Sequence, residues 1–179
     1  ARIDAVCIVA MTVGWQPRRV SFQIGKQDVV FDLNIKGVGA GHTRIHRGLA
    51  RVTGTDTFDI QVKHNVLFSD LERYTPWLPS DSHRYYAYGI NAGGIKLPGE
   101  AYSDTSTYIV RGGNPALTEE QAERISALTD RYHREQGAEI SRMWQLGLTH
   151  AVSEPALHGI IAGISSVSQL QELVNWYGN

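Results

Sequence analysis

Stretches of apolar and β-branched residues predict five short strands along the chain. They cover residues 3–10, 34–40, 58–62, 84–88 and 157–163. Each stretch is five to eight residues long and is bounded by turn-forming residues. Short, nearly continuous apolar runs of this kind are typical of strands that are buried on both faces of a sheet.

Two predicted helices begin with the paired signals of a capping box. In residues 118–135, Thr118 and Gln121 stand three apart, and apolar residues follow at helical spacing. The last helix of the chain has the same start, with Ser166 as the cap and Gln169 as its partner. In a capping box each side chain satisfies a backbone N–H group that the first turn of a helix leaves unpaired. Local sequence therefore sets both helix starts.

Three further helices are predicted because apolar residues recur at helical spacing and so form a stripe along one side of a helix. One such pattern covers residues 138–151, and Pro155 prevents its continuation because proline lacks a backbone N–H group. Shorter stripes occur in residues 42–53 and in residues 66–78, where Pro76 breaks the pattern. Residues 97–115 are rich in Gly, Ser, Thr and Pro, which predicts a loop.

The order of these elements predicts an α/β fold built from parallel β/α units, in a single domain that spans residues 1–179. Consecutive parallel strands need a crossover connection, and the predicted helices provide it. A doubly wound sheet and a barrel both satisfy this order. Residues 11–33 carry no clear pattern.

Composition and charge narrow the classes of partner. Seventeen Lys and Arg residues balance eighteen Asp and Glu residues, and no basic block is present, so we expect neither nucleic acid nor an anionic membrane surface as a partner. The longest apolar run, residues 6–13, is far shorter than the roughly 20 residues that cross a bilayer. Cys7 is the only cysteine, so an intramolecular disulfide is excluded. These features predict a soluble protein of the reducing cytoplasm.

Local motifs of catalytic or metal-binding chemistry are weak in this sequence. The glycines of residues 37–41 follow a predicted strand and are interpreted either as a phosphate-binding turn or as a tight turn alone. His42 and His46 have the i, i+4 spacing of a helical zinc site but lack its glutamate, so surface histidines are favoured and no metal is predicted. Residues 163–166 lack the pattern of a nucleophile elbow.

Several segments in one order resemble the strand motifs of aldo-keto reductases. The match begins with IKGVGAG at residues 35–41, QVKHNVL at residues 61–67 and YAYGINAGGI at residues 86–95, which resemble the family's fifth, sixth and seventh strands. Residues 140–155 resemble its next helix, and IAGISSVSQLQE at residues 161–172 resembles its last strand, turn and helix start. Together these segments lie within residues 35–177.

The resemblance implies a partial or shortened (β/α)8 TIM barrel that binds NAD or NADP and transfers hydride to or from a small carbonyl, alcohol or sugar substrate. It implies that Gln61 holds the carboxamide of the nicotinamide and that Tyr88 stacks on the nicotinamide ring. It also implies that Gly163, Ser165 and Gln169 form the turn that meets the adenosine phosphate. The alternative interpretation is that these residues only pack under loops and cap a helix.

Departures from the family pattern set limits on what the resemblance implies. Gly41 and His42 replace a Ser-Asn pair, and Leu173 replaces an asparagine. The last turn offers no Lys or Arg for a 2′-phosphate, so NAD is preferred to NADP. The family's catalytic Asp, Tyr and Lys precede its fourth strand, so no catalytic residue is assigned and this chain alone is expected to be inactive.

Two other interpretations are kept beside the enzyme. The first is a non-catalytic binding or interaction protein of aldo-keto reductase type. Its exposed sheet edges would be covered by a homo-oligomer or by a further segment of chain, because unpaired strand edges otherwise invite aggregation. The second is a distinct β/α fold in which the likeness to the family is only local.

Overall fold

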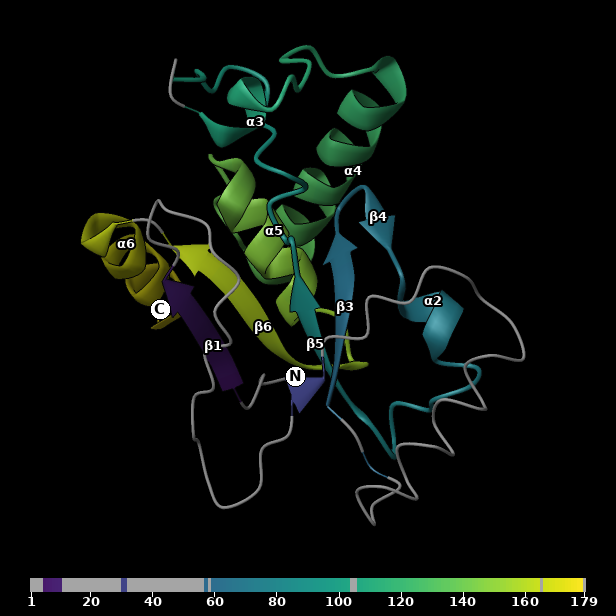
Figure 1. The fold of residues 1–179 in the computed structure, drawn as a ribbon. Coiled ribbons are helices and arrows are strands. Elements are labelled where there is room, and N and C mark those ends of the chain that lie inside the picture. Colours follow the sequence, from purple (N-terminus) through teal and green to yellow (C-terminus); the bar gives the residue numbers. More distant parts are fainter. Residues whose placement is uncertain are drawn as a thin grey trace.

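A computed structural model describes residues 5–10, 30–31, 57, 59–103, 106–164 and 166–178 (Figure 1). The strands are β1 (Ala5–Ala10), β2 (Val30–Phe31), β3 (Asp59–Asn65), β4 (Phe68–Ser69), β5 (Arg84–Tyr88) and β6 (Leu157–Ile164). The helices are α2 (Leu71–Tyr74), α3 (Thr107–Val110), α4 (Glu119–Gln136), α5 (Met143–Val152) and α6 (Val167–Gly178).

The strands form one sheet in the order β1-β6-β5-β3-β2, and every neighbouring pair on this path is parallel. The short strand β4 pairs antiparallel with β3, which makes the sheet mixed. At the start of β3, Asp59 lies opposite Arg84 of β5, and the two side chains form a bidentate ion pair with nitrogen–oxygen distances of 2.6 and 3.0 Å. This pair helps to fix the register between β3 and β5.

The predicted TIM barrel is wrong, because the sheet is open. Its path ends at β1 on one side and at β2 on the other, and within the described residues these two strands do not pair with each other. Parallel pairing, which the alternation of strands and helices predicts, is found for β3, β5 and β6. A sequence motif at the end of one strand reflects only the β/α unit to which that strand belongs. Closure depends on the number, tilt and stagger of all the strands together, which such motifs do not encode.

One face of the sheet carries the main core and is called here the helix face. Ile60, Val62, Ala87, Ile160 and Ala162 alternate along β3, β5 and β6 and are at most 5% exposed. Side chains from three helices pack against them: Leu71 of α2, Leu148 and Ala151 of α5, and Leu173 of α6. Alternation along a strand therefore places every second residue of β3, β5 and β6 under helices.

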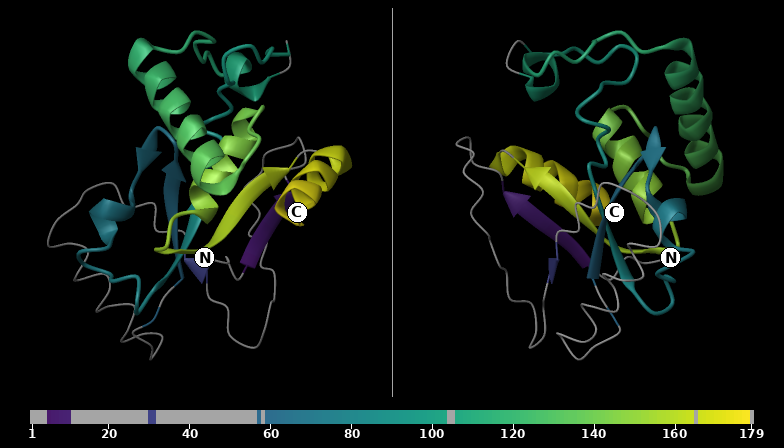
Figure 2. Two further views of the ribbon diagram at one scale, coloured as in Figure 1. Left: turned by 180° about the vertical axis from the view of Figure 1, so that it is seen from behind. Right: turned by 45° about the vertical axis from the view of Figure 1, so that its right-hand side comes forward.

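A second core cluster joins α4 and α5 beyond the carboxyl ends of the strands. It contains Val66, Ile95, Ile125, Tyr132, Met143 and Leu146. In all views α3 and the start of α4 lie well beyond the arrowheads of β3 and β5 (Figure 1, Figure 2). The molecule therefore has a sheet-and-helix body and a smaller helical part attached through α5.

The predicted helix starts are confirmed for α4 and largely for α6. Thr118 and Gln121 form the full capping box, and Gly137 ends α4 in the left-handed conformation with φ of 65°. At α6, Ser166 Oγ accepts the N–H of Gln169 at 3.2 Å. Helix α5 begins at Met143 rather than at residue 138, because the Gln145 side chain accepts the N–H groups of Ser141 and Arg142 and so caps the helix there.

The prediction of a helix over residues 66–78 is wrong. Asn65 Oδ1 accepts the N–H groups of Leu67 and Phe68, each at 3.0 Å, and this turns the chain back into β4. Only the single turn α2 follows. The predicted strand at residues 34–40 and the predicted helix at residues 42–53 lie outside the described residues. Within the part of the chain that the structure describes, no helix is long and apolar enough to span a membrane.

Candidate functional site

The face of the sheet opposite the helix face carries most of the polar and aromatic strand residues, and is called here the tyrosine face. By alternation it contains Gln61 and Lys63 of β3, Tyr86 and Tyr88 of β5, and Ile161 and Gly163 of β6. Lys63, Tyr88 and Gly163 are exposed, whereas the other three are partly buried. Tyr88 keeps 41% of its surface exposed, which is high for a tyrosine in a central strand.

Strand register brings two of the predicted cofactor residues together on this face. Gln61 pairs with Tyr86, and Tyr88 stands two residues further toward the carboxyl end of β5. At the usual strand spacing and rise, the Cα atoms of Gln61 and Tyr88 are roughly 8 Å apart. An amide and an exposed phenol ring at this separation suit a flat ring that carries a polar substituent.

Lys63 supplies a positive charge within the same surface. It lies opposite Tyr88 in the register of β3 and β5, and its Nζ atom is 5.0 Å from the centre of the Phe68 ring. The sheet thus presents an amide, aromatic rings and a cation side by side, which are groups able to bind an aromatic anion.

The predicted phosphate turn is only partly described. Gly163 lies near the carboxyl end of β6, and a Cβ atom added there would meet nothing within 4 Å, so the backbone is accessible from that side. Gln169 is exposed in the first turn of α6, where its N–H is satisfied by Ser166. Ser165 lies outside the described residues. The structure therefore places Gly163 on the same face as Gln61 and Tyr88. Gln169 lies in the first turn of α6, the helix that follows β6.

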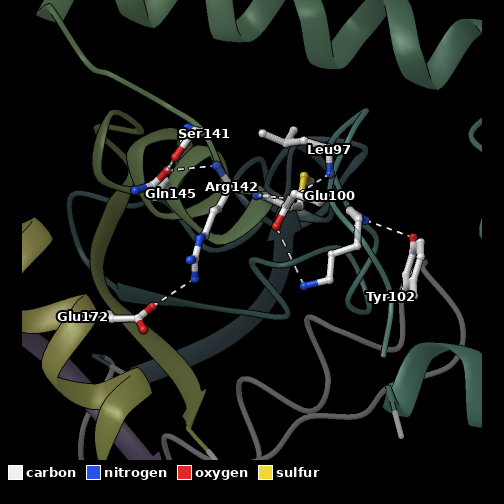
Figure 3. A network of polar contacts seen from close by, with 9 residues as sticks. Leu97, Glu100, Tyr102, Ser141, Arg142, Gln145 and Glu172 are labelled. Atoms are coloured by element: carbon white, nitrogen blue, oxygen red, sulfur yellow. Dashed lines mark hydrogen bonds and ion pairs between the residues drawn. The ribbon is translucent and has the colours of Figure 1, made fainter. Parts of the chain in front are cut away.

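A polar network fixes the loop after β5 to the start of α5, and Arg142 before that start to Glu172 of α6 (Figure 3). Glu100 Oε2 accepts the N–H groups of Leu97 and Met143, each at 2.8 Å, and so caps α5 from a distant loop. Arg142 Nη1 lies 3.3 Å from Glu172 Oε2 of α6. The partial positive charge at a helix start favours the Glu100 carboxylate. The sequence predicted only a loop here, because a cap from 43 residues away leaves no local pattern.

The turn after β5 is held by a close approach of α5. Gly147 of α5 lies so near the turn that an added Cβ atom would be 2.4 Å from the backbone oxygen of Ile90. Within the turn, Gly89, Gly93 and Gly94 have positive φ values, as does Ala92 at 48°. Loop and helix therefore fit together without room for a larger residue at position 147.

A buried cluster of ionisable side chains, which the sequence did not predict, lies at the junction of β3, α4 and α5. The rings of His64 and His150 stack, with centroids 4.8 Å apart and planes 7° apart. His150 Nδ1 is 2.7 Å from the Tyr132 hydroxyl, and Arg131 donates to that hydroxyl at 2.8 Å. His64 Nδ1 is 2.9 Å from Ser69 Oγ. Ser69, Arg131, Tyr132 and His150 lay in three separate predicted helices, and His64 lay between a predicted strand and a predicted helix. No sequence signal connected them.

Burial governs the ionisation of this cluster. Burial, followed by the nearby charges of His64, Arg131 and Arg124, lowers the pKa of His150 to about 4. Burial also lowers the pKa of His64, and Glu154 opposes that change. The pKa of Tyr132 is raised by burial, with Arg131 acting in the opposite direction. Both imidazoles are therefore neutral at neutral pH.

Searches of protein-family models and of curated protein sequences give no match for this chain. Among the described residues, no three His, Cys, Asp or Glu side chains gather as a metal site. His42 and His46, the predicted histidine pair, lie outside those residues. The functional interpretation therefore rests on the tyrosine face itself.

Proposed function

We propose that the protein binds a nicotinamide dinucleotide on the tyrosine face and acts in NAD(P)-dependent hydride transfer of the aldo-keto reductase type. One observation carries the proposal: β3, β5 and β6 bring Gln61, Tyr88 and Gly163 to one face of the sheet. These residues come from three segments that are separate in the sequence. The substrate class is a small carbonyl compound or alcohol, including sugars, and the compartment is the cytoplasm.

Each group has a defined task in this proposal. The Gln61 amide both donates to and accepts from the carboxamide of the nicotinamide, while Tyr88 offers its ring face to the nicotinamide ring. Lys63 meets the diphosphate, and the backbone near Gly163 lies close to the start of α6, where helix N–H groups favour an anion. NAD is preferred to NADP. Hydride transfer itself is chemistry that the bound dinucleotide supplies.

A fluorescence titration with NADH and NADPH tests the proposal. We expect saturable binding, tighter for NADH, and a loss of affinity of about tenfold in Gln61→Ala and in Tyr88→Leu, because each removes one ring or carboxamide contact. Gln171→Ala is the matched control, since Gln171 is exposed on α6 away from this face. Absence of binding by folded protein, or equal loss in the control, contradicts the proposal.

A non-catalytic binding protein is the second candidate function. The observation that favours it is the position of the buried phenol and imidazole pair, Tyr132 and His150, which belongs to the contact between α4 and α5 rather than to the tyrosine face. In this case the dinucleotide binds without turnover. Oxidation of NADH by a panel of small aldehydes and ketones separates the two: turnover supports the oxidoreductase, while binding without turnover supports the binding protein.

A further inference from the structure

The cluster around His64 and His150 joins three parts of the fold. His64 comes from β3, His150 from the last turn of α5, and Tyr132 from α4. His64 is 3% exposed and Tyr132 is 1% exposed. The contact between α4 and the sheet-and-helix body therefore contains a continuous polar path, from Arg131 through Tyr132 and His150 to His64 and Ser69.

The hydrogen bonds fit neutral imidazoles. A guanidinium can only donate, so Arg131 takes an acceptor position on the Tyr132 hydroxyl and leaves the phenol proton available for His150 Nδ1. Ser69 Oγ accepts the N–H of Leu71 at 3.2 Å and has its own proton available for His64 Nδ1. A second proton on either ring would turn its Nδ1 atom into a donor, and the hydroxyl that now donates to it would have to reorient.

The surroundings offer little compensation for a positive charge. With Nδ1 accepting from Ser69, His64 Nε2 carries the proton of the neutral ring, and this buried atom has no hydrogen-bond partner, so a charged ring would find no acceptor on that side. Arg124 and Arg131 of α4 face His150, and each histidine faces the other. Glu154, which follows α5, acts on His64, and Glu135 of α4 acts on Tyr132. Stacked rings whose centroids are 4.8 Å apart repel each other strongly once both carry charge.

We propose that the stacked His64–His150 pair is an acid-sensitive latch, which holds α4 against the body of the protein at neutral pH and releases it when the pair is protonated. Release exposes the second core cluster, including Ile125 of α4 and Val66 beside β3. The main core under α5 and α6 is a separate apolar cluster and stays closed. The device is therefore local: one helical part opens while the sheet stays folded.

The direction of the pH response follows from the lowered pKa values. A histidine whose folded pKa lies below its ordinary value of 6.5 takes up its proton only in the opened state. The closed state therefore loses stability as the pH falls from 6.5 toward about 4, and it is most stable above 6.5.

Amide hydrogen exchange, corrected for the intrinsic effect of pH, tests the latch in the wild-type protein. Between about pH 7.5 and about pH 5, we expect exchange in α4 to speed up at least tenfold while β5 and β6 change little. His150→Gln retains a group that accepts from Tyr132 but cannot gain a proton, so its α4 should lose most of this response. His133→Gln is the matched control, because His133 is exposed on α4. Uniform opening of the whole chain, or an unchanged response in His150→Gln, overturns the proposal.

Histidine NMR signals of the wild-type protein give a second readout if His150→Gln does not fold. His150 should titrate well below the ordinary histidine pKa of 6.5, and α4 amide signals should change together with it. Titration of His150 at that ordinary value, or without any change in α4, also overturns the latch.

Discussion

The two faces of the sheet are built from the same three strands but by opposite rules. On the helix face, Ile60, Ala87 and Ile160 are at most 3% exposed and are closed over by helices. On the tyrosine face, the alternate residues Gln61, Tyr88 and Gly163 are polar, aromatic or without a side chain, and two of the three are exposed. Successive side chains of a strand point to opposite faces of the sheet, so each strand residue contributes either to the helix face or to the tyrosine face. The helix face accounts for the stability of the fold, and the tyrosine face is where binding is proposed.

Substitution of two glycines, one in α5 over the helix face and one on the tyrosine face, tests most sharply whether the two faces differ in their effect on stability. Gly147→Ala places a methyl group against the backbone oxygen of Ile90, so we expect a loss of roughly 2–3 kcal/mol in the free energy of unfolding. Gly163→Ala, on the tyrosine face, meets no atom within 4 Å and should change stability by less than about 0.5 kcal/mol. Chemical denaturation measures both. Similar losses in the two variants contradict the separation of the faces.

Lowering the pH is expected to have the next largest effect on the free energy of unfolding. It should act on the contact between α4 and the sheet-and-helix body. His150 alone gives a slope of about 1.4 kcal/mol per pH unit between its unfolded and folded pKa values. The loss begins below pH 6.5 and ends near pH 4, the folded pKa of His150. The full interval would give about 3.5 kcal/mol, but the His150 ring is only partly buried and solvent screens its charge, so we expect a total of about 2 kcal/mol. Thermal unfolding across this range measures it, and a curve that is flat above pH 4 contradicts it.

Removal of the Glu100 cap should have a smaller effect that reaches the loop after β5. Glu100→Ala leaves the N–H groups of Leu97 and Met143 without their acceptor, and we expect a loss of about 1–2 kcal/mol. Glu139→Ala is the matched control, because Glu139 is exposed just before α5 and should change stability by less than about 0.5 kcal/mol. Equal effects of the two substitutions rule out the cap.

The smallest effect on stability is expected on the tyrosine face, where function should be affected instead. Tyr88→Leu keeps an apolar side chain at an exposed position and should change the free energy of unfolding by less than about 0.5 kcal/mol. Affinity for NADH should nevertheless fall about tenfold. Trp77→Leu is the control, since Trp77 is 60% exposed beside α2. A clear loss of stability in Tyr88→Leu would contradict this expectation, because it would show that the Tyr88 side chain contributes to the core.

Local patterns predicted the elements well where the determining residues are close in sequence. The capping box of Thr118 and Gln121, the five residues of β5 and the strand β6 all follow from neighbours within one turn or one strand. Parallel pairing also followed from the alternation of strands and helices. These are properties of short segments, which a single sequence carries directly.

The features that failed depend on partners distant in the sequence. Closure of the sheet is a property of all its strands, so matches to single strand motifs led to a barrel that the open path from β1 to β2 contradicts. Glu100 caps a helix that begins 43 residues later, and His64 stacks on a ring 86 residues away. For the site, sequence named Gln61 and Tyr88, but only strand register showed that they share a face with Lys63.

Chemical-shift mapping with NADH tests the central claim most directly, because it reports on the two faces in one measurement. We expect the backbone signals of Gln61, Lys63 and Tyr88, together with those at the start of α6, to shift in a saturable way. Signals of the helix-face core, such as Leu148 and Ala151 of α5, should stay unchanged. Shifts confined to the helix face, or none at saturating NADH, would contradict dinucleotide binding at the tyrosine face.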